Sequence, residues 1–275
     1  IITANVQRGS GSGPVKIYIG QGENIQELTY KTEFEYSQSP IVSSYIGSYV
    51  PAAKTEKKEG SLMEAVLWKP GSIAFDKEGT LYIVEDEDRD IRIAKDNQVA
   101  TFLRGDVTGG VAFRMMNIAF SSDGNTLFLS NDANGSGSAH IATMSWSNDA
   151  HQYDTESLAA IWSITSSLGN GVTNVGVHPV TGEVFSVAHG NAMIYKYDPE
   201  QNTMVTTGQQ LPDADGKNAS KVKIRCILFD KAGTTVYMSS QEKDVIYKGD
   251  YDMVTGLFSN LHIWIGQYDK TGFVE

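Results

Sequence analysis

A hairpin-like segment that occurs four times constrains the fold of this chain more than any other sequence feature. Each copy consists of an apolar strand, a tight turn closed by glycine and a second apolar strand. Glycine is typical of turn positions where the backbone takes a positive φ. The turn glycines follow one another at intervals of about 50 residues, a period typical of β-propeller blades and similar arrays. They are Gly79, Gly124, Gly182 and Gly233.

Each copy extends into a predicted four-stranded unit. In the first, strands are expected at 73–76, 80–84, 91–94 and 99–103. Four antiparallel strands in about 35 residues form one propeller blade. Comparable units begin near residues 116, 175 and 227. The predicted fold class is therefore all-β, with a β-propeller over residues 41–275.

Composition excludes several classes of partner. The formal net charge is −11, from 33 acidic and 22 basic side chains. Binding to nucleic acid or to an anionic membrane needs Lys and Arg concentrated on one face, and no such concentration occurs. The single cysteine, Cys226, excludes an internal disulfide and lies in an apolar strand, where a core role is expected. No apolar run approaches the roughly 18 residues that span a bilayer.

Residues 1–40 lie outside the repeat. Segments 15–20, 27–30 and 31–36 alternate apolar and polar residues, as half-buried strands do. These strands, followed by Pro40, resemble the last strands of an immunoglobulin-like TIG domain. The resemblance implies that residues 1–40 are the C-terminal part of a TIG-type β-sandwich.

The blade sequences resemble a known propeller family. The segment from Pro70 to Asp86, with Ile91–Arg–Ile93 and Val99–Ala–Thr–Phe–Leu103, is similar to an NHL-repeat blade. A TIG-like module followed by NHL-type blades resembles surface lipoproteins that accompany a TonB-dependent transporter and its lid lipoprotein in Gram-negative bacteria. The resemblance implies those two partners, a location on the outer face of the outer membrane, and a lipid anchor preceding this sequence.

Propellers related to this family usually close with about six blades, and four are evident here. Closure is expected because open sheet edges are costly. The sequence is therefore expected to be a segment of a longer chain that lacks one or two blades. If it is complete, residues 41–46 are expected to donate the closing strand, so that the first and last blades meet.

Candidate ligand-binding residues come from the loops that a propeller places on one face. These are the loops between the second and third strand of each blade, at 85–90, 131–139, 189–191 and 240–244. Their polar groups suit hydrogen bonding to a sugar or a peptide, and equally suit ordinary solvated loops. The candidates are Asp88, Arg89, Asn131, Asp132, Asn134, His189, Asn191 and Glu242.

Signals for metal or catalytic chemistry are weak. The oxygen-rich segment 213–218 lacks the later glutamate of a calcium loop. The second and third repeats resemble metal-dependent lactonases, but the expected ligand positions hold Met116 and Thr173, with Asn117 and Asn174 one residue late. Such a shift turns a strand side chain to the opposite face. No cofactor and no metal site are predicted.

The sequence thus predicts a non-enzymatic binding or accessory protein of a nutrient uptake complex, with a glycan or an oligopeptide as ligand. One alternative is a propeller hydrolase or metal-dependent lactonase with an unrecognised site. Another is a scaffold that contacts only other proteins. Trp146, Trp162 and Trp264 are expected to pack between blades rather than to stack on sugars.

Overall fold

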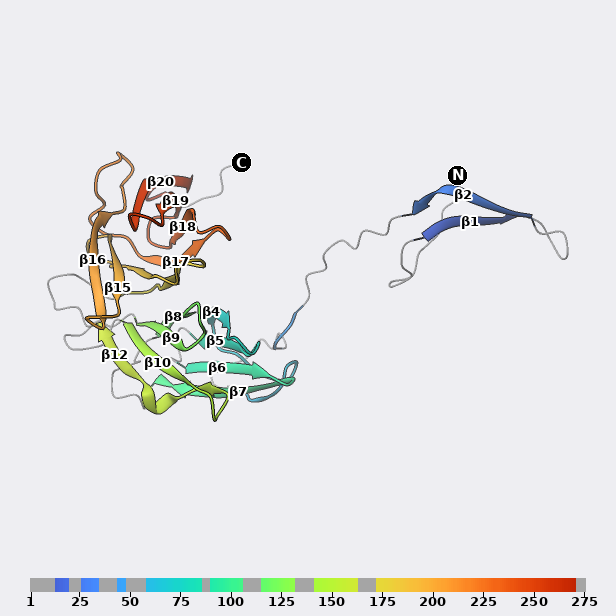
Figure 1. The fold of residues 1–275 in the computed structure, drawn as a ribbon, viewed down its shortest axis with the longest axis horizontal. Helices are drawn as coiled ribbons and strands as arrows, with labels where there is room; N and C mark the ends of the chain where they lie inside the picture. Colours follow the sequence, from blue (N-terminus) through green and yellow to red (C-terminus); the bar gives the residue numbers. More distant parts are fainter. Residues whose placement is uncertain are drawn as a thin grey trace. The chain divides into compact units, whose positions relative to one another are not determined.

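The computed structural model divides the chain into two compact units, Ile1–Ser44 and Tyr45–Glu275. It describes residues 13–19, 26–34, 44–47, 58–85, 90–105, 115–131, 141–162 and 172–270. Figure 1 shows the order of the strands within each unit. Among the described residues, no helix has the length and apolar character to span a bilayer.

The first unit contains an antiparallel hairpin of β1 (Gly13–Ile19) and β2 (Gln26–Phe34). Because β2 runs unbroken through residues 30 and 31, the two strands expected at 27–30 and 31–36 are one strand. A two-stranded hairpin is not a sandwich, so the TIG-type assignment stays a prediction.

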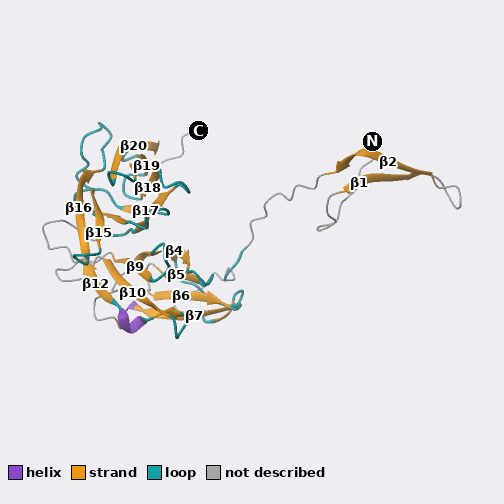
Figure 2. Ribbon diagram, in the orientation of Figure 1, coloured by secondary structure: helices purple, strands orange, loops and turns teal. Residues whose placement is uncertain are grey.

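The second unit is a four-blade β-propeller arrangement within the described residues, and Figure 2 shows that strands dominate it. Blades 1 and 2 each contain a fifth strand in addition to the four that were predicted. Blade 1 consists of β3 (Gly60–Ser61), β4 (Pro70–Phe75), β5 (Leu81–Glu85), β6 (Asp90–Lys95) and β7 (Gln98–Arg104). Blade 2 consists of β8 (Met115–Phe120), β9 (Thr126–Asn131), β10 (Ile141–Ser147), β11 (Gln152–Tyr153), the 3-10 turn η2 (Thr155–Ser157) and β12 (Ala159–Trp162).

Blades 3 and 4 are four-stranded antiparallel sheets in chain order. Blade 3 consists of β13 (Gly176–Val177), β14 (Val184–Val187), β15 (Met193–Asp198) and β16 (Thr203–Gln210). Blade 4 consists of β17 (Ile224–Phe229), β18 (Thr235–Ser240), β19 (Val245–Asp252) and β20 (Leu257–Gly266). The blade assignment made from the repeat is confirmed.

The core lies between the blades. Consecutive blades pack through their first strands, with β4 against β8, β8 against β13 and β13 against β17. Between blades 1 and 2 the ring of Tyr82 makes edge contacts with Phe120 and Tyr153. Trp162 of blade 2 is buried against Tyr195 of blade 3, with ring centroids 4.6 Å apart. The expected packing role of Trp162 is confirmed.

The four turn glycines have the predicted positive φ, between 67° and 84°. Three of them also lie against the turn of the preceding blade. A methyl group on Gly124 would meet Lys77 at 2.9 Å, and one on Gly182 would meet the Ser122 hydroxyl at 2.5 Å. The glycines therefore set the turn and also leave room for the neighbouring blade.

His178 fills the corresponding space between blades 3 and 4. It lies in the turn after β13 and is fully buried. Its Nδ1 accepts the backbone N–H of Val180 and of Thr181, at 3.2 and 3.0 Å, and its Nε2 donates to the Gly233 carbonyl at 2.7 Å. These partners require the neutral imidazole with hydrogen on Nε2. A methyl group on Gly233 would collide with this ring.

Blade 1 contains a buried ion pair. Arg92 and Glu85 are fully buried, with Nη1 and Oε2 3.8 Å apart. Arg92 Nη2 donates to the Lys58 carbonyl at 3.3 Å, and the Trp68 N–H donates to Glu85 at 2.6 Å. Through these two hydrogen bonds, the ion pair holds the segment before β4 against the blade. Glu85, expected in a loop, is instead the last residue of β5.

Candidate functional site

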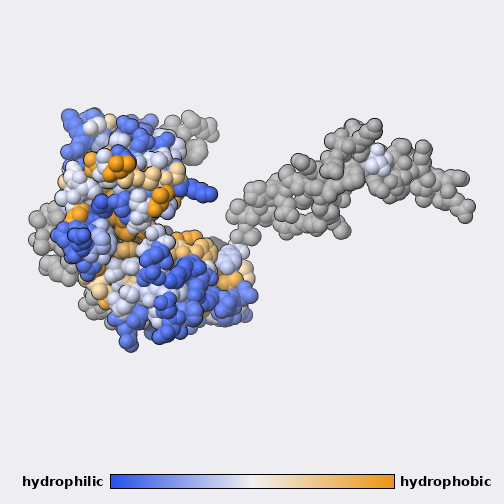
Figure 3. Space-filling model, in the orientation of Figure 1, coloured by the Kyte–Doolittle hydropathy of each residue, from blue (hydrophilic) through white to orange (hydrophobic). Residues whose placement is uncertain are grey.

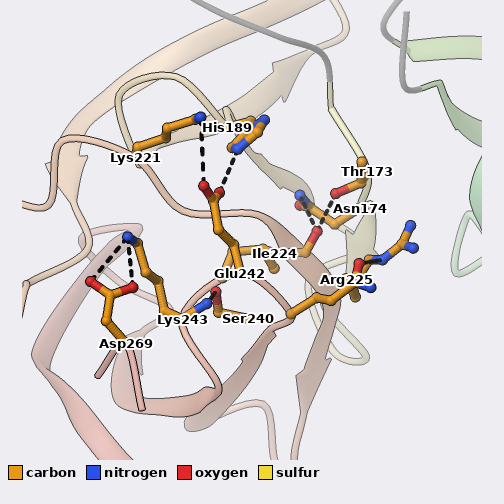
Figure 4. Close-up of polar contacts among 11 residues, drawn as sticks. Thr173, Asn174, His189, Lys221, Ile224, Arg225, Ser240, Glu242, Lys243 and Asp269 are labelled. Carbon is orange, nitrogen blue, oxygen red and sulfur yellow. Dashed lines mark hydrogen bonds and ion pairs between the residues drawn. The ribbon is translucent and has the colours of Figure 1, made fainter. Parts of the chain in front are cut away.

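A polar cluster lies where blades 3 and 4 meet, and Figure 4 shows its members. His189 follows β14, Glu242 follows β18, and Lys221 lies on the connector between the blades. His189 Nε2 and Glu242 Oε2 are 2.6 Å apart, and Lys221 Nζ lies 3.5 Å from the other carboxylate oxygen. A histidine, a carboxylate and an ammonium group from two blades and their connector therefore meet at one point.

Tight turns fix the positions of these side chains. The Ala192 N–H donates to the Ala188 carbonyl at 3.0 Å, closing a turn around His189, and Ala192 has a positive φ of 55°. The His189 carbonyl accepts the Val222 N–H at 3.1 Å, which holds the connector beside it. In the other turn, the Lys243 N–H donates to the Ser240 hydroxyl at 3.2 Å. Short turns of this kind hold their side chains on the rigid strands at either end.

Further charged groups flank the cluster (Figure 4). Lys243 Nζ lies 3.0 Å from Asp269 Oδ1. Arg225, on β17, donates from Nε to Gln241 at 2.6 Å, and its Nη1 lies 3.8 Å from the sulfur of Met116 in blade 2. The surface around the cluster thus presents both donors and acceptors of hydrogen bonds.

The surroundings of Glu242 favour its charged form. Partial burial by itself raises the pKa of Glu242. The hydrogen bond with His189 and the positive charges of Lys221 and Lys243 lower the pKa and prevail over burial, so it lies below the ordinary value of 4.5. At neutral pH the carboxylate is therefore ionised and accepts a hydrogen bond from His189.

We expect this pair to contribute to acid sensitivity. A carboxyl group whose folded pKa is lowered stabilises the fold above its unfolded pKa, and this contribution is lost as pH falls through the folded value. The temperature of the thermal unfolding midpoint should therefore decrease once the pH is below about 4.5, and Glu242→Gln should make that decrease smaller. Differential scanning fluorimetry between pH 3 and 7 measures it, with Glu200→Gln, at an exposed turn, as control. An identical pH profile for wild type and Glu242→Gln would contradict the expectation.

Four of the eight predicted ligand-binding residues are described. His189 and Glu242 are brought together as a pair. Asn191 shapes the turn, because its side chain accepts the Met193 N–H at 3.0 Å. Asn131 is fully buried at the end of β9 instead of lying in an open loop. The remaining candidates, Asp88, Arg89, Asp132 and Asn134, lie outside the described residues.

Thr173 and Asn174, which were compared with the metal ligands of lactonases, form hydrogen bonds to the backbone instead. The Thr173 hydroxyl and the Asn174 amide both donate to the Ile224 carbonyl, at 2.5 and 3.3 Å (Figure 4). Asn174 also exchanges hydrogen bonds of 2.8 and 3.0 Å with the backbone of Val187. Both residues are buried. They join blade 3 to blade 4.

Sequence reasoning missed Lys221, a member of the cluster, and Arg225, which flanks it. Lys221 lies on the connector that leads into the first strand of blade 4, and an antiparallel blade places this connector at the same ends of the strands as the candidate loops, so its position carried a usable signal. Arg225 lies within a strand, and the sequence pattern did not show which side chains of that strand face the surface near the cluster. In segment 213–218 the Asp213 carboxylate accepts two backbone N–H groups at 2.9 Å, as a turn residue does. The described residues contain no group of three metal-ligating side chains.

Comparison with known proteins identifies solved structures of the same fold. An auxiliary nutrient-binding protein from Bacteroides thetaiotaomicron matches 96% of this chain with a TM-score of 0.69 and 18% identity. The likeness establishes the fold. An auxiliary nutrient-binding protein from Bacteroides ovatus matches 95% at TM-score 0.70 and 19% identity. A candidate phosphatase from B. thetaiotaomicron matches 96% at TM-score 0.72 and 18% identity.

This chain spans 58%, 58% and 61% of the lengths of those three structures, respectively. No family model and no curated protein matches the sequence.

Proposed function

We propose that this chain is a non-enzymatic accessory protein of a nutrient uptake complex at the cell surface, and that it binds a glycan or an oligopeptide. Two solved structures with this fold are named auxiliary nutrient-binding proteins. The net charge of −11 is compatible with a neutral ligand and unfavourable to a polyanion.

The observation that carries the proposal is the cluster of His189, Glu242 and Lys221. Two blades and their connector hold these groups in place, with the His189 side chain 11% exposed and Glu242 30% exposed. A ligand hydroxyl or amide that reaches the cluster can exchange hydrogen bonds with a carboxylate, an imidazole and an ammonium group. A rigid site with several such groups orients a polar ligand.

The same proposal includes the partners and the location of the protein. We place the protein beside a TonB-dependent transporter and its lid lipoprotein, on the outer face of the outer membrane, with a lipid anchor ahead of this sequence. The NHL-type blade pattern and the TIG-like N-terminal unit support this placement. Copurification from the source membrane tests it, because the transporter and the lid protein should then be recovered with this protein.

Binding experiments test the role of the cluster directly. Arrays of defined oligosaccharides and oligopeptides should yield a ligand, and calorimetry should show at least a tenfold loss of affinity in His189→Ala and in Glu242→Gln, because each removes a charge-assisted hydrogen bond. His151→Ala is the matched control: His151 forms a second His–Glu pair, with Glu78 at 2.8 Å, at the opposite ends of the strands. Binding that survives both cluster variants would contradict the proposal.

The His189–Glu242 pair also favours a second candidate, a hydrolase in which His189 acts as general base. A carboxylate beside an imidazole orients it and stabilises its protonated form. Turnover of lactones or phosphomonoesters that His189→Ala abolishes would favour the enzyme. Binding without turnover would favour the accessory protein.

A further inference from the structure

A row of three basic residues leads into the first strand of blade 4. Lys221, Lys223 and Arg225 alternate with Val222 and Ile224. The two apolar residues are buried, whereas Lys221 is exposed and the other two basic residues are partly exposed. An extended backbone places alternate side chains on the same side, about 7 Å apart. The three positive charges, here called the basic row, therefore lie together on the outward side of this segment.

The backbone of the basic row is held by both neighbouring turns. The Val222 N–H donates to the His189 carbonyl at 3.1 Å. The Lys223 carbonyl accepts the Gln241 N–H at 3.0 Å. The Ile224 carbonyl accepts the two hydrogen bonds from blade 3 that Figure 4 shows. Hydrophilic residues cover much of the visible surface of the second unit (Figure 3), so exposure alone does not mark a site. The fixed backbone favours binding, because its charges need less ordering when a ligand arrives.

The guanidinium group of Arg225 has one contact that a ligand can replace. Its Nε donates to the Gln241 side chain at 2.6 Å, and its Nη1 lies 3.8 Å from the sulfur of Met116. A thioether sulfur is a weak acceptor, whereas a carboxylate forms short, charge-assisted hydrogen bonds with a guanidinium group, often two at once. A carboxylate that approaches Arg225 can therefore take the place of the sulfur while Gln241 keeps the side chain in position.

The blade fold does not require an arginine at this position. Arg225 stands eight residues before the turn glycine of its blade. The corresponding residues of blades 1, 2 and 3, counted with one extra residue for the longer turn of blade 3, are Gly71, Met116 and Thr173. None of the three is charged. Blade packing is therefore satisfied by an uncharged residue and does not explain the arginine.

The basic row lies in a locally positive part of an acidic chain. The net charge is −11, but segments 220–225 and 240–244 together contain four basic and two acidic residues. One of the two acidic residues, Glu242, already has Lys221 beside it at 3.5 Å. Solvent-exposed charges farther away than the Debye length, about 8 Å at physiological salt, are largely screened. A ligand carboxylate at the other end of the basic row therefore meets an attractive potential despite the net charge.

We propose that the ligand of this site carries a carboxylate group, which binds Lys223 and Arg225 while hydroxyl or amide groups of the same ligand meet the cluster. This inference rests on the proposed function, because it names the ligand class of the same site. One carboxylate on a short oligosaccharide or at the end of an oligopeptide satisfies it. A nucleic acid does not, because a protein that binds DNA contacts about 6 to 10 phosphates, and the basic row has three cations.

Paired probes test the carboxylate directly. We would screen uronate-containing oligosaccharides against their methyl esters, and short peptides with a free C-terminus against their C-terminal amides. In one of the two sets the acid should bind about tenfold or more tightly than its neutral partner, because the neutral form loses charge-assisted hydrogen bonds. A preference in the first set identifies a sugar acid, and one in the second set a peptide carboxylate. The absence of a preference for the acid in both sets would overturn the inference.

Variants of the basic row then locate the carboxylate. Arg225→Gln and Lys223→Gln should each weaken binding of the preferred acid about tenfold and leave the affinity for its neutral partner unchanged, which also shows that the variant is folded. Lys231→Gln, in the exposed turn at the other ends of the strands, removes the same charge and should change neither affinity. An equal effect of Lys231→Gln would overturn the inference, because the net charge would then explain it. Binding that needs His189 but shows no preference for the acid would reject this inference and keep the proposed function.

Discussion

Replacing Arg92 by alanine is expected to lower the free energy of unfolding by about 3 to 5 kcal/mol. Arg92 is fully buried, and its removal takes away the ion pair with the buried Glu85 carboxylate. It also removes the hydrogen bond to the Lys58 carbonyl, which holds the segment before β4. Urea denaturation followed by tryptophan fluorescence measures the loss. All four tryptophans lie in the Tyr45–Glu275 unit, so the signal reports on the propeller alone.

Two further variants test whether the loss of stability comes from breaking the ion pair or from the loss of packed side-chain atoms. Arg92→Met combined with Glu85→Leu removes both charges, and a buried pair replaced by apolar residues of similar volume is often close to neutral. We therefore expect the double variant to recover most of the lost stability. Arg225→Ala, at a partly exposed arginine, should cost less than about 1 kcal/mol. A double variant as unstable as Arg92→Ala would show that the charge pair is not the cause.

Gly233→Ala should cost about 3 kcal/mol in the 275-residue chain. The positive φ of 75° contributes about 1 kcal/mol of strain for a non-glycine residue, and the collision with the His178 ring adds about 1 to 3 kcal/mol. His178 has little freedom to move, because its two ring nitrogens are bonded to the backbone and its ring packs against Phe229 and Tyr251.

Gly79→Ala is the matched control for this prediction. Its φ of 84° imposes the same backbone strain, but a methyl group there meets no atom within 4 Å. We expect a cost of about 1 kcal/mol, from the backbone alone. Both variants are measured by the same urea titration. Equal losses for Gly79→Ala and Gly233→Ala would show that the contact with His178 has no energetic effect.

The repeat was readable in the sequence because its signals are local. A glycine that closes a turn and the apolar residues on either side lie within about a dozen positions, so the hairpins and the blade order could be predicted. The turn closed by Gly182 could be predicted in this way. The contact between the His178 ring in that turn and the glycine of the next blade could not, since it joins residues 178 and 233 and depends on how the blades pack.

The candidate site was predictable only in part for the same reason. The propeller strand order placed His189 and Glu242 on one face, and the structure adds that they touch, 53 positions apart in the chain. Glu85 was read as a loop residue because it begins an acidic run, whereas its partner Arg92 becomes visible only when β5 pairs with β6. Asn131 is the last residue of β9. A strand end placed one residue earlier in the prediction was enough to assign this buried side chain to an open loop.

The interlocked glycine turns have a consequence for where this chain can accept extra residues. The segments 76–80, 121–125, 178–183 and 230–234 link the first and second strands, and in three neighbouring pairs the turn of one blade lies against the next. A longer turn there would have to displace a neighbour. The segment 211–223, which joins blade 3 to blade 4, leaves from the other ends of the strands. Peptide tags, fluorophores or grafted loops are therefore best inserted within the exposed residues 214–218 of this connector, on the side of the propeller that carries His189 and Glu242.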